Sequence, residues 1–370
     1  MAVPTKEEKK EAALDRFNKL SASLTPMSEY EDTFISDMSK FKKRISTGIL
    51  NIDKALNGGL QDELYIMGAE TSTGKSAIMM WLAQNIANSG TDVLYFALEM
   101  GKKEFVARGI SSLSFEKWIK DQSQKRYTAG DVLYYSYDST IPDFVRIPYH
   151  AYESLSKEYF SRYGNHLYII EGGMNGLCAA DVGNLAADFK RKTGKSPVVF
   201  VDYLQLLKAD PDDRSQTDRK TKVDISVTTL KTLASQICMP VFVVSSIGRT
   251  SYNGRISSAA FKESGDTEYT GGVLIGWNWT GVTDQSDDDE KTFEKVKCYN
   301  QGYRRMSFEV LKYRNSVRDN CVDLIYFPAY SYFVDENDFH DVPDTALPKE
   351  FQKQPLAPKK QKSGKEVMRG

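Results

Sequence analysis

The sequence is poor in the residues that build metal centres and disulfide frameworks. Its 370 residues contain three histidines and four cysteines, with no C-x-x-C pair and no metal-ligand spacing among them. The pattern suggests neither a zinc site nor a disulfide framework, and it favours a reduced cytosolic compartment. No run of about 18 apolar residues occurs, and the charged N-terminus lacks the apolar stretch of a signal peptide. We therefore expect a soluble, cytoplasmic protein that has no membrane partner.

An excess of positive charge is also missing. Lysine and arginine total 49 against 50 aspartate and glutamate residues, which gives a formal net charge of -1. No global basic field therefore attracts nucleic acid, and any such binding requires a local cationic patch. What the chain does have is 41% apolar residues, which is sufficient for a substantial buried core.

Composition divides the chain into three regions. Residues 1–44 contain an amphipathic helical pattern over 5–22, which is either a solvated terminal helix or an arm that packs on a neighbouring subunit. Residues 45–345 alternate apolar strand-like runs with helical patterns, which predicts one α/β domain with a mostly parallel twisted sheet flanked by helices. Residues 346–370 are rich in Lys, Gln and Pro, so we expect a disordered basic tail.

The stretch from Phe115 to Tyr163 is crowded with aromatic residues but has no clear periodicity. We interpret it as helical cover with a surface excursion. Stacking of these rings on nucleic acid bases is the alternative, and ordinary packing is favoured over it.

The strongest chemical signal is a phosphate-binding loop. An apolar strand at 64–67 leads into Thr73-Gly74-Lys75-Ser76, after which a helical pattern begins. Backbone amides at a helix N-terminus point at phosphates, and the helix dipole favours the same anion. Gly74 lets the backbone approach, Lys75 would reach the β and γ phosphates, and Ser76 would bind Mg²⁺. The predicted nucleotide-binding residues of this loop are Ala69, which stands where the strict pattern has glycine, Glu70, Thr71, Ser72, Thr73, Gly74, Lys75, Ser76 and Ala77.

Two acidic residues follow apolar strands that a parallel sheet would place beside this loop. Asp202 ends the run VVFVD and would hold Mg²⁺ through water at the carboxyl edge of the sheet. Glu99 follows the run DVLYFAL and would polarise an attacking water as a general base. Each residue is alternatively a plain helix cap or turn residue, but beside a phosphate-binding loop we favour the catalytic roles.

Cationic side chains occur near the C-terminal end of the α/β region. The run SFEVLKYRNS alternates like a strand, so we expect Lys312 and Arg314 on one face and Leu311 and Tyr313 on the other. Two cations on one face would suit a γ phosphate. From the pattern alone, a solvated strand face is the favoured interpretation.

A second cationic stretch, GRTSYNGRISSAAFKESG, carries Arg249, Arg255 and Lys262 among Gly, Ser and Asn. Such a segment is flexible and rich in backbone donors, which suits contacts to phosphodiester groups. An ordinary surface loop is the alternative.

These motifs, in this order, resemble the RecA-fold motor domain of DnaB-type replicative helicases. The resemblance runs through STGILNIDKALNGGLQDELYIMGAETSTGKSA, FALEMGKKEFVAR, PVVFVDYLQLL, VSSIGR, KESG and KYRNS, over most of residues 45–335. It implies a RecA-like P-loop NTPase that hydrolyses ATP with Mg²⁺. It also implies a homo-hexameric ring that translocates on single-stranded DNA and unwinds duplex during replication, with a helicase loader as a further partner.

The resemblance implies roles for individual residues of one subunit's nucleotide site. Lys75 and Ser76 look like the triphosphate and Mg²⁺ residues, Glu99 like the catalytic base, and Asp202 like the acid of the second motif. Arg108, nine residues after Glu99, resembles the residue that lies beside the nucleotide base.

Other residues resemble those that act between subunits or on DNA. Lys312 and Arg314 look like the pair that reaches into the neighbouring subunit's site, so activity would require a ring. The central-channel loop that follows the DNA backbone corresponds to Lys262, Glu263 and Gly265. Six copies of a modest cationic loop around one channel would explain DNA binding by a chain of almost zero net charge.

Two departures from the family's pattern define the alternatives. The 44 residues before the motor motifs are too few for the helical domain that engages primase in this family. Ser246 stands where the family has Gln, and its shorter side chain reaches less far toward a γ phosphate. Both departures support a RecA-like DNA-dependent ATPase in recombination, or a nucleotide-controlled switch without unwinding. A nucleotide-binding scaffold with little turnover is a third alternative, which the presence of Glu99 and Asp202 opposes.

Overall fold

The structure is a computed structural model of the chain. It describes residues 14–15, 17–18, 21, 24, 26–39, 44–133, 147–172, 176–211, 218–247, 255–258, 260–261, 272–280, 302–313 and 320–342. The chain divides into two units, Met1–Arg44 and Ile45–Gly370. The basic tail expected at 346–370 lies outside the described residues.

In the smaller unit, a 3-10 helix, η1 (Met27–Tyr30), leads into helix α2 (Glu31–Ser39). Residues 14–15, 17–18 and 21 are also helical, within the stretch where the sequence predicts a helix. The sequence pattern did not indicate α2, whose side chains Phe34 and Ile35 are exposed.

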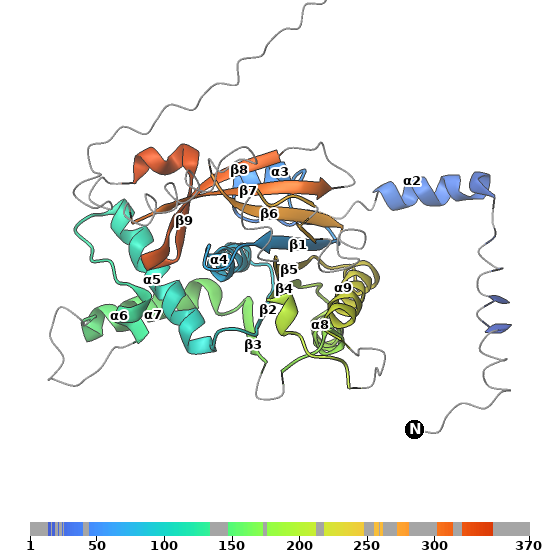
Figure 1. Ribbon diagram of the computed structural model, residues 1–370, viewed down its shortest axis with the longest axis horizontal. Helices are drawn as coiled ribbons and strands as arrows, with labels where there is room; N and C mark the ends of the chain where they lie inside the picture. Colours follow the sequence, from blue (N-terminus) through green and yellow to red (C-terminus); the bar gives the residue numbers. More distant parts are fainter. Residues whose placement is uncertain are drawn as a thin grey trace, which may run out of the picture. The chain divides into compact units, whose positions relative to one another are not determined.

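Within the described part of the larger unit, one nine-stranded sheet organises the fold (Figure 1). Its spatial order is β3-β2-β4-β5-β1-β6-β7-β8-β9. The strands from β3 to β6 pair in parallel, and those from β6 to β9 pair antiparallel. The expectation of a mostly parallel sheet is therefore confirmed. The strands are β1 (Leu64–Ala69), β2 (Val93–Ala97), β3 (Leu167–Glu171), β4 (Val198–Asp202), β5 (Val241–Ser246), β6 (Val273–Trp279), β7 (Arg304–Tyr313), β8 (Asn320–Phe327) and β9 (Tyr332–Asp335).

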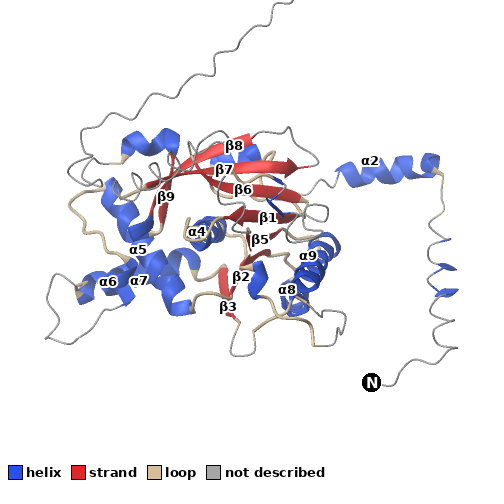
Figure 2. Ribbon diagram, in the orientation of Figure 1, coloured by secondary structure: helices blue, strands red, loops and turns tan. Residues whose placement is uncertain are grey.

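Helices cover both faces of the parallel strands (Figure 2). Strand β1 shows why, because Tyr65 and Met67 pack into the cluster that contains α4, whereas Leu64 and Ile66 pack into the cluster that contains α8 and α9. A strand that is buried on both faces consists of consecutive apolar residues, and the sequence of β1 follows this pattern. The helices are α3 (Leu50–Ala55), α4 (Lys75–Asn88), α5 (Lys102–Lys120), α6 (Ala129–Leu133), α7 (Tyr149–Tyr163), α8 (Ala179–Thr193) and α9 (Arg219–Gln236), with 3-10 turns η3 (Leu204–Leu206), η6 (Pro328–Tyr330) and η7 (Glu336–Asp341). No helix in the described ranges is long and apolar enough to cross a membrane.

The aromatic stretch agrees with the packing interpretation where it is described. It forms the end of α5, then α6 and α7, and residues 134–146 between them lie outside the described residues. Tyr127, Tyr159 and Tyr163 are buried in one apolar cluster with residues of α5.

The predicted alternation around Lys312 is wrong. Val310 pairs with Ile275, but Lys312 pairs with Leu274, so Leu311 is the extra residue of a β-bulge. Leu311 consequently packs on the α8 and α9 side, and Tyr313 packs on the α4 side. Arg314 lies outside the described residues.

A row of aromatic rings crosses the centre of the sheet. Phe200 of β4 stacks between Tyr95 of β2 and Phe242 of β5, with ring centroids 6.0 Å and 5.6 Å away, and Phe242 also stacks on Tyr65 of β1. The ring of Phe200 is fully buried. These contacts join the four strands that carry the site described below.

We expect Phe200→Ala to lower the free energy of unfolding by about 3 to 5 kcal/mol, because it removes a fully buried ring and leaves a cavity. Urea unfolding followed by circular dichroism measures the change. The control is Leu50→Ala, since the Leu50 side chain is 69% exposed and its loss should cost less than about 0.5 kcal/mol. Equal losses in the two variants would contradict the packing described here.

Candidate nucleotide-binding site

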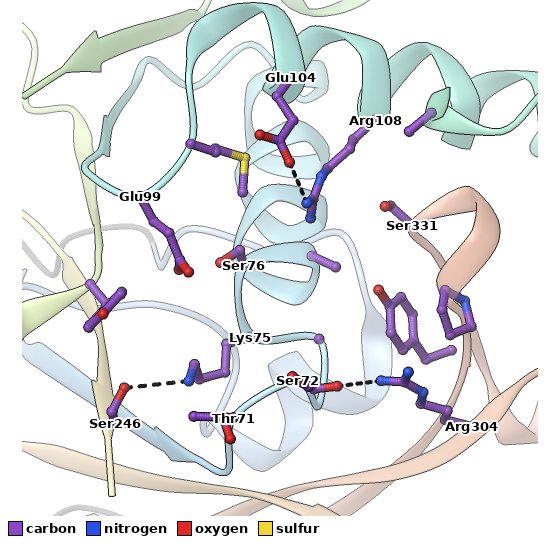
Figure 3. Close-up of a pocket in the computed structure, with 17 residues that line it drawn as sticks. Thr71, Ser72, Lys75, Ser76, Glu99, Glu104, Arg108, Ser246, Arg304 and Ser331 are labelled. Carbon is purple, nitrogen blue, oxygen red and sulfur yellow. Dashed lines mark hydrogen bonds and ion pairs between the residues drawn. The ribbon is translucent and has the colours of Figure 1, made fainter. Parts of the chain in front are cut away.

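A cavity of about 700 Å³ lies at the carboxyl ends of the parallel strands (Figure 3). Its lining comes from the loop after β1, from residues that end or follow β2, β4 and β5, and from α5, β7 and β8. In an open parallel sheet this edge is where ligands bind, because the loops that follow the strands converge there.

The phosphate-binding loop joins β1 to α4 and is held from the antiparallel half of the sheet. Gly74 has φ +95°, and a Cβ there would lie 2.6 Å from the ring of Tyr326 in β8. Ser72 also has a positive φ, of 63°. The indole of Trp277 in β6 donates a hydrogen bond to the Thr73 carbonyl, at 3.1 Å. The loop is thus fixed with its backbone close to its neighbours and with the N-terminus of α4 facing the cavity, which favours an anion there.

Lys75, the first residue of α4, is buried and directed across the cavity. Its ammonium group donates a hydrogen bond to the Ser246 hydroxyl at the end of β5, at 3.4 Å, and lies 5.8 Å from the Tyr203 ring. The backbone of Ser246 is itself fixed by Gln205, whose side-chain amide accepts from its N–H and donates to its carbonyl, both at 3.1 Å. A buried ammonium group that lines the cavity is suited to receive a phosphate.

Asp202, the last residue of β4, is 1% exposed and directly precedes Tyr203, which lines the cavity. The Tyr95 hydroxyl donates to its Oδ2 at 2.9 Å. Burial raises the pKa of Asp202, against hydrogen bonds from Ser76 and Tyr95 that lower it. Its Oδ1 has no hydrogen-bond partner among the described residues. A buried carboxylate oxygen without a partner, beside a serine hydroxyl, fits a site for a hard cation such as Mg²⁺.

Glu99 follows β2 and points into the cavity toward Ser76 (Figure 3). Its negative charge raises the pKa of Asp202, so the two carboxylates lie close enough to repel each other. A cation bound between them would relieve this repulsion. Water that enters the cavity beside Glu99 would meet a carboxylate able to accept its proton.

Arg108 lies in a different part of the cavity from Lys75. It projects from α5 and forms an ion pair with Glu104, one helical turn away (Figure 3). Pro328 and Ser331, which flank the turn between β8 and β9, line the cavity as well. This compartment therefore offers a planar guanidinium that is paired with a carboxylate, together with small side chains.

Arg304 is a site residue that the sequence did not reveal. It is the first residue of β7, and its guanidinium donates a hydrogen bond to the Ser72 carbonyl of the phosphate-binding loop. It also lies 5.8 Å from the Trp279 ring and 5.7 Å from the Tyr326 ring. No motif surrounds it, so only knowledge that β7 returns antiparallel beside β6 would have identified it.

The remaining predicted residues fall in three groups. Within the described residues, the cavity is not lined by Ala69, Glu70 or Thr73, which lie in the loop's supporting layer, where Glu70 accepts bonds from Thr73 and Trp279. Lys312, at the other end of β7 from Arg304, does not line it either, and Arg255 forms an ion pair with Glu309, at 2.7 Å. The predicted residues that lie outside the described residues are Arg249, Lys262, Glu263, Gly265 and Arg314.

The parallel sheet, the loop and the buried acid define the chain as a RecA-like P-loop domain. The family model described as the DnaB-like helicase C-terminal domain matches residues 44–128 and 152–335. The chain belongs to this family, and nucleotide binding is a property that the family implies.

Relatives and solved structures agree with this assignment. The chain is 27% identical over 256 residues to the replicative DNA helicase DnaB of Pasteurella multocida, covering 68% of this chain and 50% of that protein. It is 26% identical over 234 residues to the replicative DNA helicase DnaC of Bacillus subtilis, covering 62% of this chain and 46% of that protein. The chain thus spans about half the length of these curated relatives.

Two solved structures share the fold. One is described as an ATPase domain, with a TM-score of 0.60 and 20% identity, and the match covers 84% of this chain and 98% of that one. The other is described as a DnaB-like replicative helicase and its interactions with primase, with a TM-score of 0.62, 19% identity, and coverage of 88% and 75%.

We expect Gly74→Ala to weaken nucleotide binding by about tenfold or more, the equivalent of ~1.4 kcal/mol, because the added methyl group meets the Tyr326 ring. Fluorescence titration with a labelled ATP analogue measures the affinity. Gly90→Ala is the matched control, since Gly90 has a similar φ of +85° but no atom within 4 Å of an added Cβ. Both variants bear backbone strain, so a loss of binding in both, or in neither, would contradict the steric argument.

Proposed function

We propose that this chain is the motor of an ATP-driven, hexameric DNA helicase of the DnaB type, which moves on single-stranded DNA and separates duplex during replication. The observation that carries the proposal is that Lys75, Ser76 and Glu99 line one cavity, with the buried Asp202 beside Ser76 and its Oδ1 lacking a hydrogen-bond partner among the described residues. In a chain of this family, these groups are what hydrolysis of a nucleoside triphosphate requires.

The chemistry assigned to the cavity starts with phosphate binding. The backbone amides at the start of α4 and the Lys75 ammonium group bind the triphosphate, and Lys75 exchanges its contact with Ser246 for a phosphate oxygen. Ser76 and Asp202 would hold Mg²⁺, which neutralises phosphate charge when bound. Glu99 orients the attacking water and accepts its proton. The heterocyclic base of the nucleotide occupies the compartment beside Arg108.

The geometry of β7 supports a ring. Arg304 at the start of β7 contacts its own phosphate-binding loop, whereas Lys312 lies eight residues further along the strand, about 26 Å away. This distance is too long for Lys312 to contact its own phosphate-binding loop, and we assign Lys312, together with Arg314, to a neighbouring subunit's nucleotide. The exposed apolar side chains of α2, Phe34 and Ile35, supply a surface for packing against a second copy.

Single-stranded DNA is assigned to the segment that contains Arg249, Lys262, Glu263 and Gly265. In a hexamer, six copies of this segment face one channel and together supply the cationic lining that a single chain lacks. A helicase loader remains an expected partner.

We expect Lys75→Ala to abolish both ATP hydrolysis and the opening of a fork with a free single-stranded tail. Glu99→Gln should retain nucleotide binding and lower kcat by about 10² to 10⁴, because only proton transfer to the carboxylate is lost. Phosphate release and fork opening measure the two activities. Glu153→Gln is the control, since Glu153 pairs with Lys157 on the surface of α7.

The same assays separate the alternatives. Hydrolysis without strand separation, on tails of either polarity, would favour a recombination ATPase or a nucleotide-controlled switch. Absence of hydrolysis by the unaltered chain would favour a nucleotide-binding scaffold.

The shared site has its own test. Arg314→Ala subunits and Lys75→Ala subunits should each be inactive, and mixing them should restore part of the ATPase activity, because some interfaces then pair an intact Lys75 with an intact Arg314. ATPase activity is measured over a series of mixing ratios, with each variant alone as the control. No recovery at any ratio would contradict the assignment of Arg314 to the neighbouring site.

A further inference from the structure

Arg255 sits in a tight polar cluster instead of projecting alone from a loop. Its Nε donates a hydrogen bond to Oε2 of Glu309, at 2.7 Å. Glu309 lies in β7, and its side chain is only 7% exposed. The guanidinium group is therefore held by a carboxylate that belongs to the sheet itself.

Asn278 of β6 completes the cluster. Its Nδ2 donates to the same Glu309 oxygen at 2.9 Å, and its Oδ1 accepts from the backbone N–H of Ile256 at 2.8 Å. The Ile256 carbonyl lies 3.5 Å from Asn278 Nδ2. The backbone next to Arg255 is thus bound to an amide side chain that is 5% exposed. The Asn278 amide thus contacts both the N–H and the carbonyl of Ile256, as a neighbouring strand would.

The same segment is fixed again a few residues later. The Phe261 ring covers Gly68 of β1 so closely that a Cβ at Gly68 would lie 2.6 Å from it. Phe261 immediately precedes Lys262, the first residue of the predicted channel loop. Residues 255–258 and 260–261 therefore form a base that contacts β1, β6 and β7, directly before the predicted channel-loop residues Lys262, Glu263 and Gly265.

The electrostatics of the cluster favour keeping Arg255 paired with Glu309. Burial raises the pKa of Glu309, and the ion pair with Arg255 lowers it. A buried carboxylate that loses its partner is strongly destabilising. A DNA phosphate that drew Arg255 away from Glu309 would leave this carboxylate unpaired at that cost, whereas an ion pair on the surface contributes little free energy.

We propose that Arg255 is a positioning residue, which with Glu309 and Asn278 fixes the base of the DNA-contacting segment to β6 and β7. This proposal rests on the proposed function and changes the role expected for Arg255 within it. Because Arg304 ties the start of β7 to the phosphate-binding loop, the cluster connects the DNA segment to the strand that contacts the nucleotide site. Loss of the cluster should weaken DNA binding even though no phosphate contact is removed.

Glu309→Gln gives opposite results for the two roles. If Arg255 bound a phosphate, removing the Glu309 charge would release it and tighten binding. For a positioning role, Glu309→Gln and Arg255→Gln should each weaken binding by about tenfold to a hundredfold, the equivalent of one charge-assisted hydrogen bond. The double variant should be no weaker than either single one, because the two residues act as a unit.

The measurement is titration of a fluorescent oligothymidylate, with a non-hydrolysable ATP analogue present, at several salt concentrations. The slope of log affinity against log salt should be the same in Arg255→Gln as in the unaltered chain. A slope that becomes shallower by about 0.7, the value for one lost phosphate contact on a single strand, would overturn the proposal. Tighter binding by Glu309→Gln would overturn it as well.

Asp323→Asn is the matched control. Asp323 lies in β8 and its charge acts on Glu309, but among the contacts of the described residues its carboxylate accepts from Ser307 and Thr280 and has none with Arg255. Its replacement removes one negative charge nearby and should leave DNA affinity unchanged. If Asp323→Asn weakened DNA binding as much as Glu309→Gln does, loss of a nearby negative charge would explain both effects. That result would overturn the positioning role.

Amide hydrogen exchange keeps this test separate from that of the proposed function. In Glu309→Gln, the Ile256 amide should lose protection, whereas amides of α4 should keep theirs. Unchanged protection of Ile256 would overturn the cluster's role whether or not DNA binds. If the unaltered chain failed to bind the oligonucleotide at all, the helicase proposal would fall, and the exchange result would still decide the positioning role.

Discussion

The parallel register of four central strands is the constraint on which the site depends. Ala97 of β2 pairs with Asp202 of β4, and Ala69 of β1 pairs with Ser246 of β5, so these strands end flush along one edge. A slip of one residue would turn each side chain to the opposite face of the sheet. The stacked aromatic row and the alternating apolar packing hold this register. The register in turn places Asp202 and Ser246 at the same edge of the sheet as the phosphate-binding loop.

Ionisable groups of both signs are gathered at that edge. Burial opposes ionisation of Asp202, Glu99 repels it, and one of its oxygens lacks a partner among the described residues. The Lys75 ammonium group donates a hydrogen bond to the Ser246 hydroxyl, and its charge lowers the pKa of Asp202. The arrangement stores unfavourable electrostatics that a phosphate and a divalent cation together would relieve, which is the general relation between a binding site and the fold that holds it.

The sequence was informative where function is encoded locally. A loop between a strand and a helix, and an acid at the end of an apolar strand, are recognisable from a few adjacent residues, so Lys75 and Asp202 lie where their motifs predict. Arg304 could not be found in this way, because its contact with Ser72 joins residues 232 positions apart in the chain. The bulge at Leu311 could not be predicted for a related reason. One extra residue moves every later side chain of the strand to the opposite face of the sheet, and the alternation of residue types alone does not reveal it.

Strand β7 connects three regions that lie in separate motifs of the sequence. Its first residue, Arg304, contacts the nucleotide loop, its centre holds the Arg255 cluster through Glu309, and its end carries Lys312. Because β7 is hydrogen-bonded to β6 on one side and β8 on the other, it moves as part of the sheet. On the proposed function, the loop of one site, the DNA segment and the residues directed at the next site therefore share one rigid element. If β7 shifted with the sheet in such a ring, the displacement would reach all three places together.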